Sequence, residues 1–340
     1  MSTDTTAGTA AEAERFETLQ GKISDVKEQI GRVIVGQEEI IDQILMAICG
    51  GGHCLMVGVP GLAKTLMVHT FADALHLSFK RIQFTPDLMP ADITGSQVIE
   101  EAPEGGRSFK FVKGPLFANL ILADEINRTP PRTQAALLEA MQEHSITVGR
   151  ESYKLNEPFF VLATQNPIEQ EGTYPLPEAQ QDRFMFFLHV RYPEQEEEKE
   201  VLRRTTRSSM PRAEAVMTGD EVREVQRLVR EVPIADHVLD YANRLSRATR
   251  LDRGAEGHQS VPDFVREYVE WGAGPRAGQY LVIGGKARAF LQGRSHVDTG
   301  DIRAVAHPVL RHRIIVNFSA QAEGMDSEKI VDRLLEHVKA

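Results

Sequence analysis

Apolar residues along this chain fall into two kinds of pattern. From Phe16 to Cys49 they recur every three or four residues, which predicts helices, and a break at residues 33–36 separates two of them. Beyond this point, short apolar runs alternate with helical stretches, and such runs are typical of buried strands. The runs are Cys54–Val57, Arg81–Phe84, Leu120–Ala123, Phe159–Ala163 and Phe184–Val190. Strands alternating with helices predict an α/β fold, with a parallel sheet covered by helices on both faces.

The same pattern divides the chain into segments. Residues 1–15 are rich in Thr, Ala and Glu and are expected to be disordered. Residues 16–192 hold the expected α/β core. Residues 193–212 begin with a charged run that we interpret as a solvated helix start, and with their several arginines they are expected to form a solvated linker. Residues 213–340 are helical in pattern apart from a Gly/Pro-rich stretch at 271–275, which predicts a smaller all-α domain whose Tyr268 and Trp271 pack inside it.

Composition narrows the class of protein. The 340 residues carry a formal net charge of −10, which weighs against a dedicated nucleic-acid binder. Cys49 and Cys54 are too few for a disulfide framework and are expected to be free thiols in the core. The apolar runs fall short of the roughly 20 residues needed to cross a bilayer, and the first residues lack the order of a signal peptide. A cytoplasmic location is therefore expected.

A glycine-rich loop follows the first predicted strand and opens a helix. In this context the backbone N–H groups cradle phosphates, a lysine reaches the β- and γ-phosphate oxygens, and a threonine hydroxyl binds Mg²⁺. The strict pattern has Gly where Ala63 stands, and a turn that only joins a strand to a helix is the alternative interpretation. The expected nucleotide contacts are Gly58, Val59, Pro60, Gly61, Leu62, Ala63, Lys64, Thr65 and Leu66.

Two adjacent carboxylates end another predicted strand. Asp124 and Glu125 follow the apolar run Leu120–Ala123, and the carboxyl ends of parallel strands meet at one edge of a sheet. Asp124 is expected to hold Mg²⁺ through water, and Glu125 to act as the general base on the attacking water. The simpler alternative is an aspartate that caps a helix. Together with the upstream loop, the pair predicts an ATPase that uses ATP and Mg²⁺, with Thr65 and Asp124 at the metal.

With these motifs the chain resembles the MoxR family of AAA+ ATPases, in which Ala before the loop lysine is usual. The resemblance covers roughly residues 31–312. It is carried further by four stretches, at 81–88, 123–131, 163–169 and 178–184. It implies a fold in which an AAA+ P-loop NTPase domain is followed by a helical lid domain.

The resemblance also assigns roles by position. Asn166 matches the sensor-1 residue that helps to orient the attacking water. Arg183 matches the arginine finger, which reaches the γ-phosphate held by the neighbouring subunit. Arg276 matches sensor 2, which is expected to bind ATP of its own subunit, and Val35 and Gly36 lie where the adenine pocket begins. The plainer alternatives are a turn Asn for the first, a surface salt bridge for Arg183 and a solvated helix-start Arg for Arg276.

Two further segments match insertions of this group. Residues 93–112 resemble the insert that interrupts helix 2, and residues 145–153 read as a hairpin that resembles the pre-sensor-1 hairpin. In related rings such elements face the central pore and touch substrate. Ordinary surface loops are the alternative.

The resemblance implies a ring-forming chaperone. It implies a hexameric ring of identical subunits, a protein client, and a partner protein with a von Willebrand factor type A domain. An ATPase subunit of a metal chelatase, a nucleic-acid remodelling motor and a non-hydrolysing ATP switch share the phosphate chemistry. The net charge of −10 disfavours the nucleic-acid motor. The simultaneous presence of the two carboxylates, Asn166 and Arg183 disfavours the switch.

Overall fold

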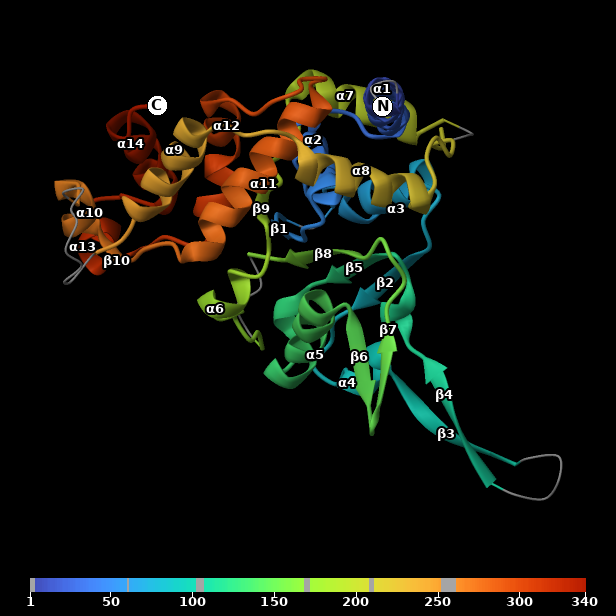
Figure 1. Cartoon of the computed structure of the whole chain (residues 1–340). Coiled ribbons are helices and arrows are strands. Elements are labelled where there is room, and N and C mark those ends of the chain that lie inside the picture. Colours follow the sequence, from blue (N-terminus) through green and yellow to red (C-terminus); the bar gives the residue numbers. More distant parts are fainter. Residues whose placement is uncertain (1–3, 60, 102–106, 168–171, 208–210, 252–260) are drawn as a thin grey trace.

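A five-stranded parallel sheet forms the centre of the α/β core. The computed structural model describes residues 4–59, 61–101, 107–167, 172–207, 211–251 and 261–340. The strand order is β2-β5-β8-β1-β9 (Figure 1). The strands are β1 (Cys54–Val57), β2 (Phe79–Gln83), β5 (Leu120–Asp124), β8 (Phe160–Gln165) and β9 (Phe186–His189). All five apolar runs therefore lie in strands of one sheet, as predicted.

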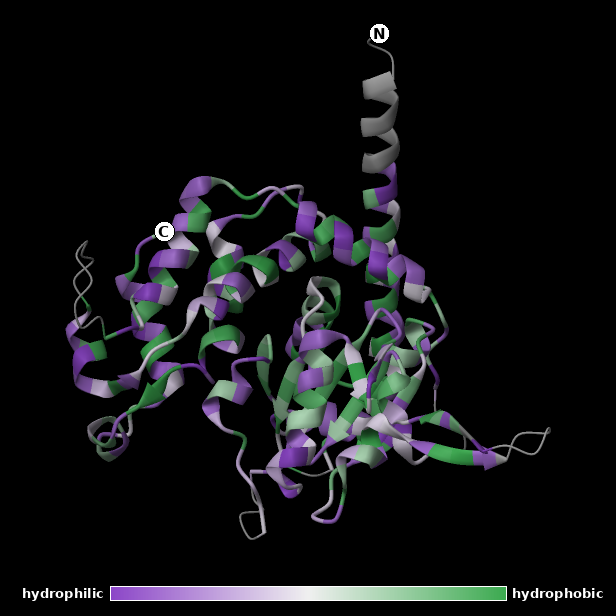
Figure 2. Ribbon diagram, turned by 60° about the horizontal axis from the view of Figure 1, so that its bottom comes forward, coloured by the Kyte–Doolittle hydropathy of each residue, from purple (hydrophilic) through white to green (hydrophobic). Residues whose placement is uncertain are grey.

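Helices cover both faces of this sheet. Because side chains alternate along a strand, Cys54 and Met56 of β1 join one apolar core while Leu55 joins the other. Helices α2 (Glu38–Gly50) and α3 (Lys64–Ala74) pack in the first core, and α5 (Pro131–Glu143) packs in the second. Apolar residues are concentrated in this central region (Figure 2). Cys49 and Cys54 are buried free thiols, as expected.

The first helix begins earlier than the sequence suggested. Helix α1 spans Asp4–Val33, so the expectation of disorder over residues 1–15 is wrong for residues 4–15, and residues 1–3 lie outside the described part. Ala and Glu favour a helix, and the apolar face of α1 buries Leu19, Val26 and Ile30. The segment thus extends a helix that is anchored in the core.

The residues interpreted as a linker also contain a helix. Helix α7 (Gln195–Thr205) occupies much of 193–212. The side chain of Arg204 donates hydrogen bonds to the carbonyls of Gly31 and Arg32 at 3.2 and 2.9 Å, and so satisfies the C-terminal end of α1. Arg204 is therefore a structural contact rather than a solvated linker residue.

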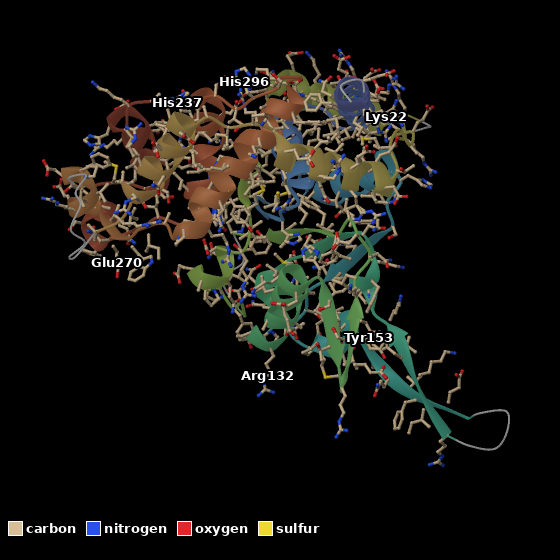
Figure 3. All side chains as sticks on the ribbon, in the orientation of Figure 1. Lys22, Arg132, Tyr153, His237, Glu270 and His296 are labelled. Atoms are coloured by element: carbon tan, nitrogen blue, oxygen red, sulfur yellow. The ribbon has the colours of Figure 1, made fainter. Side chains whose placement is uncertain are left out.

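Two β-hairpins leave the core on the same side. The first consists of β3 (Gly95–Glu101) and β4 (Arg107–Lys113), and projects away from the molecule (Figure 1). The second, of β6 (Ser145–Val148) and β7 (Glu151–Lys154), confirms the predicted hairpin. Phe111 of β4 stacks on Tyr153 of β7 with ring centroids 4.2 Å apart, and Figure 3 shows Tyr153 on the side that faces the first hairpin. Short helical segments flank these elements: α4 (Pro90–Thr94), η1 (Pro115–Phe117), η2 (Ile126–Arg128) and α6 (Glu178–Gln181).

The second domain is mainly helical. Its helices are α8 (Gly219–Glu231), α9 (Asp236–Arg247), α10 (Asp263–Tyr268), α11 (Pro275–Leu291), α12 (Thr299–Leu310), α13 (Phe318–Ala322) and α14 (Ser327–His337). A short antiparallel ladder of β10 (Val269–Trp271) and β11 (Ile315–Val316), which the pattern did not predict, interrupts them. Tyr268 is buried as expected, but the prediction for Trp271 is wrong, because this side chain is 70% exposed on the open ladder. No helix in the described ranges is long and apolar enough to cross a membrane.

Candidate nucleotide-binding site

The glycine-rich loop joins β1 to α3 at the carboxyl end of the sheet. Gly61 and Ala63 both have positive φ, 86° and 52°. A residue other than Gly or Asn rarely adopts this region, but Ala63 does so here as the residue that precedes α3. At Gly58 a Cβ would lie 2.9 Å from Cβ of Val190, so only Gly fits beside this residue. Pro60 lies outside the described residues.

A cavity of about 370 Å³ opens beside this loop. Its lining includes Lys64 and Thr65 of the loop and α3, the adjacent Asp124 and Glu125, and Asn166. Five predicted site residues from three separate parts of the sequence therefore meet at one edge of the sheet. The cavity is lined by Gly61, Ala63, Lys64, Thr65, Arg81, Asp124, Glu125 and Asn166.

The charge arrangement in this cavity suits a magnesium–triphosphate group. Partial burial lowers the pKa of Lys64, while the nearby Asp124 and Glu125 carboxylates act to raise it. The Lys64 ammonium donates a hydrogen bond to the carbonyl of Gly58 within its own loop. Phosphate would supply oxygens for this cation, and the Thr65 hydroxyl and Asp124 carboxylate are oxygen donors of the kind Mg²⁺ prefers. The residues present therefore fit both groups.

Thr164 joins the two carboxylate residues. This buried residue of β8 donates from its hydroxyl to Oδ1 of Asp124 at 2.6 Å and accepts from the Glu125 backbone N–H at 2.9 Å. Glu125 itself has a left-handed backbone, with φ of 58°. The contact holds the Asp124 carboxylate and the backbone of Glu125 at the turn that ends β5.

Three further polar side chains hold the carboxylates. Arg81 donates to Oδ2 of Asp124 through Nη2 at 2.7 Å and Nε at 3.1 Å. Gln83 Nε2 and Arg128 Nη1 donate to Oε2 of Glu125 at 2.7 and 3.0 Å. The sequence analysis assigned no role to Arg81, Gln83, Arg128 or Thr164. The one available signal was that Arg81 and Gln83 are two residues apart on a predicted strand, and therefore share a face.

A second, mainly apolar cavity adjoins the first. The two share Gly61 and Ala63, so they can receive the phosphate and base ends of one nucleotide. Val35, Leu62 and Leu66 line it as predicted, and Val201, Arg204 and Thr205 of α7 line it without having been predicted. Gly36 is absent from the described lining; a Cβ there would meet the Glu197 carboxyl carbon at 2.6 Å. Its role is therefore to let α7 approach.

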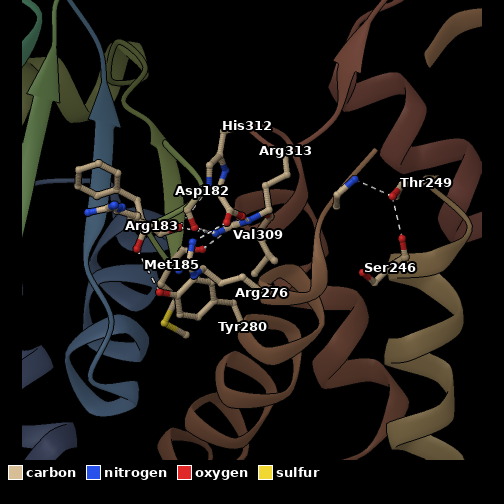
Figure 4. A network of polar contacts seen from close by, with 12 residues as sticks. Asp182, Arg183, Met185, Ser246, Thr249, Arg276, Tyr280, Val309, His312 and Arg313 are labelled. Carbon is tan, nitrogen blue, oxygen red and sulfur yellow. Dashed lines mark hydrogen bonds and ion pairs between the residues drawn. The ribbon is translucent and has the colours of Figure 1, made fainter. Parts of the chain in front are cut away.

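The two arginines assigned from the resemblance lie elsewhere. Arg183 donates from Nη1 to the carbonyl of Leu138 at 3.1 Å and lines a separate polar cavity with Gln180 and residues of α5 and β6. Arg276 donates from Nη1 to Oδ2 of Asp182 at 2.6 Å (Figure 4). Neither is among the described residues that line the phosphate cavity. The assignment of Arg276 as a contact for the nucleotide of its own subunit stays a prediction; in this structure the start of α11 packs beside Asp182.

A buried cation ties this arginine segment to the lid. Arg313 is almost completely buried and donates from Nε to Oδ1 of Asp182 at 2.8 Å and from Nη2 to the carbonyls of Asp182 and Phe184 at 2.7 and 2.6 Å (Figure 4). Burial lowers the pKa of Arg313, and the Asp182 carboxylate opposes this shift. Asp182 thus accepts from Arg276 and Arg313 together, and the lid holds the backbone next to Arg183 in place.

The fold and this site define a P-loop ATPase of the AAA class with its lid domain. Residues 53–186 match the ATPase family associated with various cellular activities (AAA), and residues 263–334 match the AAA lid domain.

Similar proteins narrow the class to one family. The chain is 40% identical over 331 residues to "Chaperone MoxR1" of Mycobacterium tuberculosis, covering 97% of this chain and 84% of that one. It is 30% identical to "Protein MoxR" of Paracoccus denitrificans, covering 87% and 89%. A crystal structure from Cytophaga hutchinsonii, assigned as an ATPase, superposes with a TM-score of 0.88 at 42% identity and covers 97% and 98%. The chain belongs to the MoxR family of AAA+ ATPases.

Proposed function

We propose that this protein is a Mg²⁺-dependent ATPase that works in the cytoplasm as a ring-forming chaperone, remodelling or maturing partner protein complexes. One observation carries the proposal. The phosphate cavity unites Lys64, Thr65, Asp124, Glu125 and Asn166, whereas Arg183 lies outside it. One subunit thus supplies the residues that bind ATP and activate water. In this proposal, the Arg183 that completes the site comes from a neighbouring subunit.

The residues divide the work of hydrolysis among them. Lys64 and the loop N–H groups bind the phosphates, while Thr65 and Asp124 hold Mg²⁺. When bound, this ion neutralises charge on the phosphate oxygens. Glu125 accepts a proton from the attacking water, and Asn166 orients that water. The Thr164 hydroxyl supports this arrangement through two hydrogen bonds, one to the Asp124 carboxylate and one from the Glu125 backbone N–H.

The positions of the two arginines support an assembly. Arg183 and Arg276 are linked through Asp182 and its backbone on a face separate from the phosphate cavity. A contact between two different faces of identical subunits repeats from one subunit to the next, and it forms a ring when the rotation that relates the subunits closes. We propose a hexamer in which Arg183 completes the site of the next subunit.

The hairpins are the proposed contact for a protein client. Ile99 and Phe109 are cross-strand partners on β3 and β4, and they are 60% and 74% exposed. Apolar side chains left exposed on a projecting element favour contact with another protein. The further proposal of a partner with a von Willebrand factor type A domain rests on the family alone.

Steady-state ATPase rate against protein concentration, with Mg²⁺ and with excess chelator, tests the proposal. We expect a specific rate that rises with concentration and is lost with the chelator, because the complete site forms between subunits. A Mg²⁺-independent rate would contradict the metal role. A rate that stays flat down to concentrations at which light scattering shows monomers would contradict the shared site.

A further inference from the structure

Arg81 is a cation in the phosphate cavity to which the proposed mechanism of hydrolysis assigns no role. It lies on β2, and its guanidinium lines the cavity beside Asp124 and Glu125. Nε and Nη2 donate to Oδ2 of Asp124 at 3.1 and 2.7 Å, and Nη2 also donates to Oε1 of Gln83 at 2.6 Å. The side chain is nevertheless 47% exposed, so it can leave this position without disturbing the core.

The strand pairing puts Arg81 at the carboxylate end of the cavity. Strands β2 and β5 pair in parallel with Gln83 opposite Asp124, and Arg81 precedes Gln83 by two residues on the same face. Its partners are therefore the proposed metal ligand and a residue bonded to Glu125, whereas Lys64 belongs to the loop. Arg81 therefore lines the same cavity as the loop residues Lys64 and Thr65, which would hold the phosphates of a bound ATP.

Oδ2 of Asp124 cannot accept both hydrogen bonds from Arg81 and also bind a hydrated metal ion. Its Oδ1 accepts from Thr164, and its Oδ2 accepts two N–H groups of Arg81. A hydrated Mg²⁺ needs free carboxylate oxygen lone pairs, because its own waters donate to them. Binding of the metal with the nucleotide would therefore displace the guanidinium from Oδ2. A planar guanidinium released into an anionic site pairs readily with two phosphate oxygens.

We propose that Arg81 is a binding residue for the terminal phosphate of ATP, and that it returns to Asp124 when this phosphate is absent. The inference rests on the proposed ATP-binding function, and it adds to the same site a residue that distinguishes ATP from ADP. ATP offers Arg81 a new anionic partner in exchange for Asp124. ADP lacks the terminal group, so Arg81 stays on Asp124 and competes with Mg²⁺ there.

The test is the ratio of ADP affinity to ATP-analogue affinity, measured by equilibrium fluorescence titration in Mg²⁺. The probes are N-methylanthraniloyl derivatives of ADP and of β,γ-imido-ATP, which needs no turnover. In Arg81→Met we expect the preference for the triphosphate to fall at least about tenfold, because one bidentate charged contact is lost. Arg81→Lys keeps the positive charge but cannot donate two parallel hydrogen bonds, so its preference for the triphosphate should lie between those of the wild type and Arg81→Met. Lys80→Met removes a neighbouring cation on the other face of β2 and should leave the preference unchanged.

An unchanged preference in Arg81→Met would overturn the inference, whether both affinities drop together or neither does. An equal loss in Lys80→Met would also overturn it, since general charge would then be the cause. Thermal unfolding of each variant checks that the fold is kept. If the wild-type protein binds neither probe, the proposed ATPase function itself fails; if it binds both and Arg81→Met matches it, only the role of Arg81 fails.

Discussion

The Thr164 hydroxyl lies 2.6 Å from Oδ1 of Asp124 and at the same time accepts the Glu125 N–H at 2.9 Å. One small side chain from the middle strand of the sheet thus holds the carboxylate of Asp124 and the backbone of Glu125, at the end of the neighbouring strand. Because Thr164 is buried, its two hydrogen bonds face no competition from water.

Replacing Thr164 by Val should slow hydrolysis while nucleotide affinity changes little. The variant keeps the volume of the side chain but leaves a carboxylate oxygen and a backbone N–H without their partner, so we expect kcat to fall roughly tenfold. Thr164→Ser keeps the hydroxyl and should retain most of the rate. A loss of kcat of the same size in both variants would show that packing, not the hydrogen bonds, is responsible.

Glu125→Gln should separate binding from turnover. The amide keeps the size of the side chain but cannot accept a proton, so turnover should fall by about 10²–10⁴-fold while fluorescent ATP still binds. Lys64→Ala is the contrasting variant, which should lose nucleotide binding because the phosphates lose their cation. Normal hydrolysis by Glu125→Gln would place the base on another residue.

Arg183→Ala should be inactive alone but rescuable in mixtures. Loss of a finger arginine lowers turnover by about 10³-fold or more, and binding should be unaffected because Arg183 is not in the phosphate cavity of its own subunit. Mixing it with Glu125→Gln creates some interfaces with an intact base and an intact arginine. ATPase assays over a series of mixing ratios should show partial recovery. Absence of recovery at every ratio, in mixtures shown to co-assemble, would mean that Arg183 does not act across an interface.

Stability should fall with rising pH through one lid contact. His307 of α12 pairs with Glu328 at 2.6 Å and Asp332 at 3.0 Å on α14, and the Glu328 hydrogen bond raises the pKa of His307 above its ordinary 6.5, against opposition from burial and Arg311. A raised folded-state pKa stabilises the protein fully below about 6.5 and progressively less as pH rises through the folded value.

Denaturant unfolding of the wild type and of His307→Gln should therefore differ most at pH 6 and converge by pH 9. Glu328 also faces Arg311 and His189, so His189→Gln is the matched control: burial lowers the pKa of His189, and the pH dependence that its removal causes should therefore run in the opposite direction. A difference in the free energy of unfolding between the wild type and His307→Gln that does not change with pH would exclude titration of His307 as its cause.

The sequence could predict the sheet because its strands are buried on both faces. The runs Leu120–Ala123 and Phe159–Ala163 are almost entirely apolar, so local pattern and tertiary burial agree there. The phosphate loop and carboxylates were placed for a related reason, since a parallel sheet brings the carboxyl ends of its strands to one edge.

Features that depend on contacts between distant segments could not be predicted in this way. The charged run at 193–200 indicated a solvated helix start within a linker, yet Val201 and Arg204 of α7 line the base cavity. Local composition cannot tell a solvated helix from one that covers a site with a single face. Likewise the sequence context of Arg276 suggests a nucleotide contact, but the ion pair that Arg276 makes with Asp182 depends on the packing of the lid and could not be predicted.

Asp182 gives the proposed ring a direction. Arg276 and Arg313, both from the lid, pair with the Asp182 carboxylate, and Asp182 directly precedes Arg183. If Arg183 serves the next subunit as proposed, a movement of the lid would change the position of this arginine at the neighbouring site. Each subunit would thus complete the active site of only one of its two neighbours. ATP hydrolysis would then proceed from subunit to subunit in a single direction around the ring.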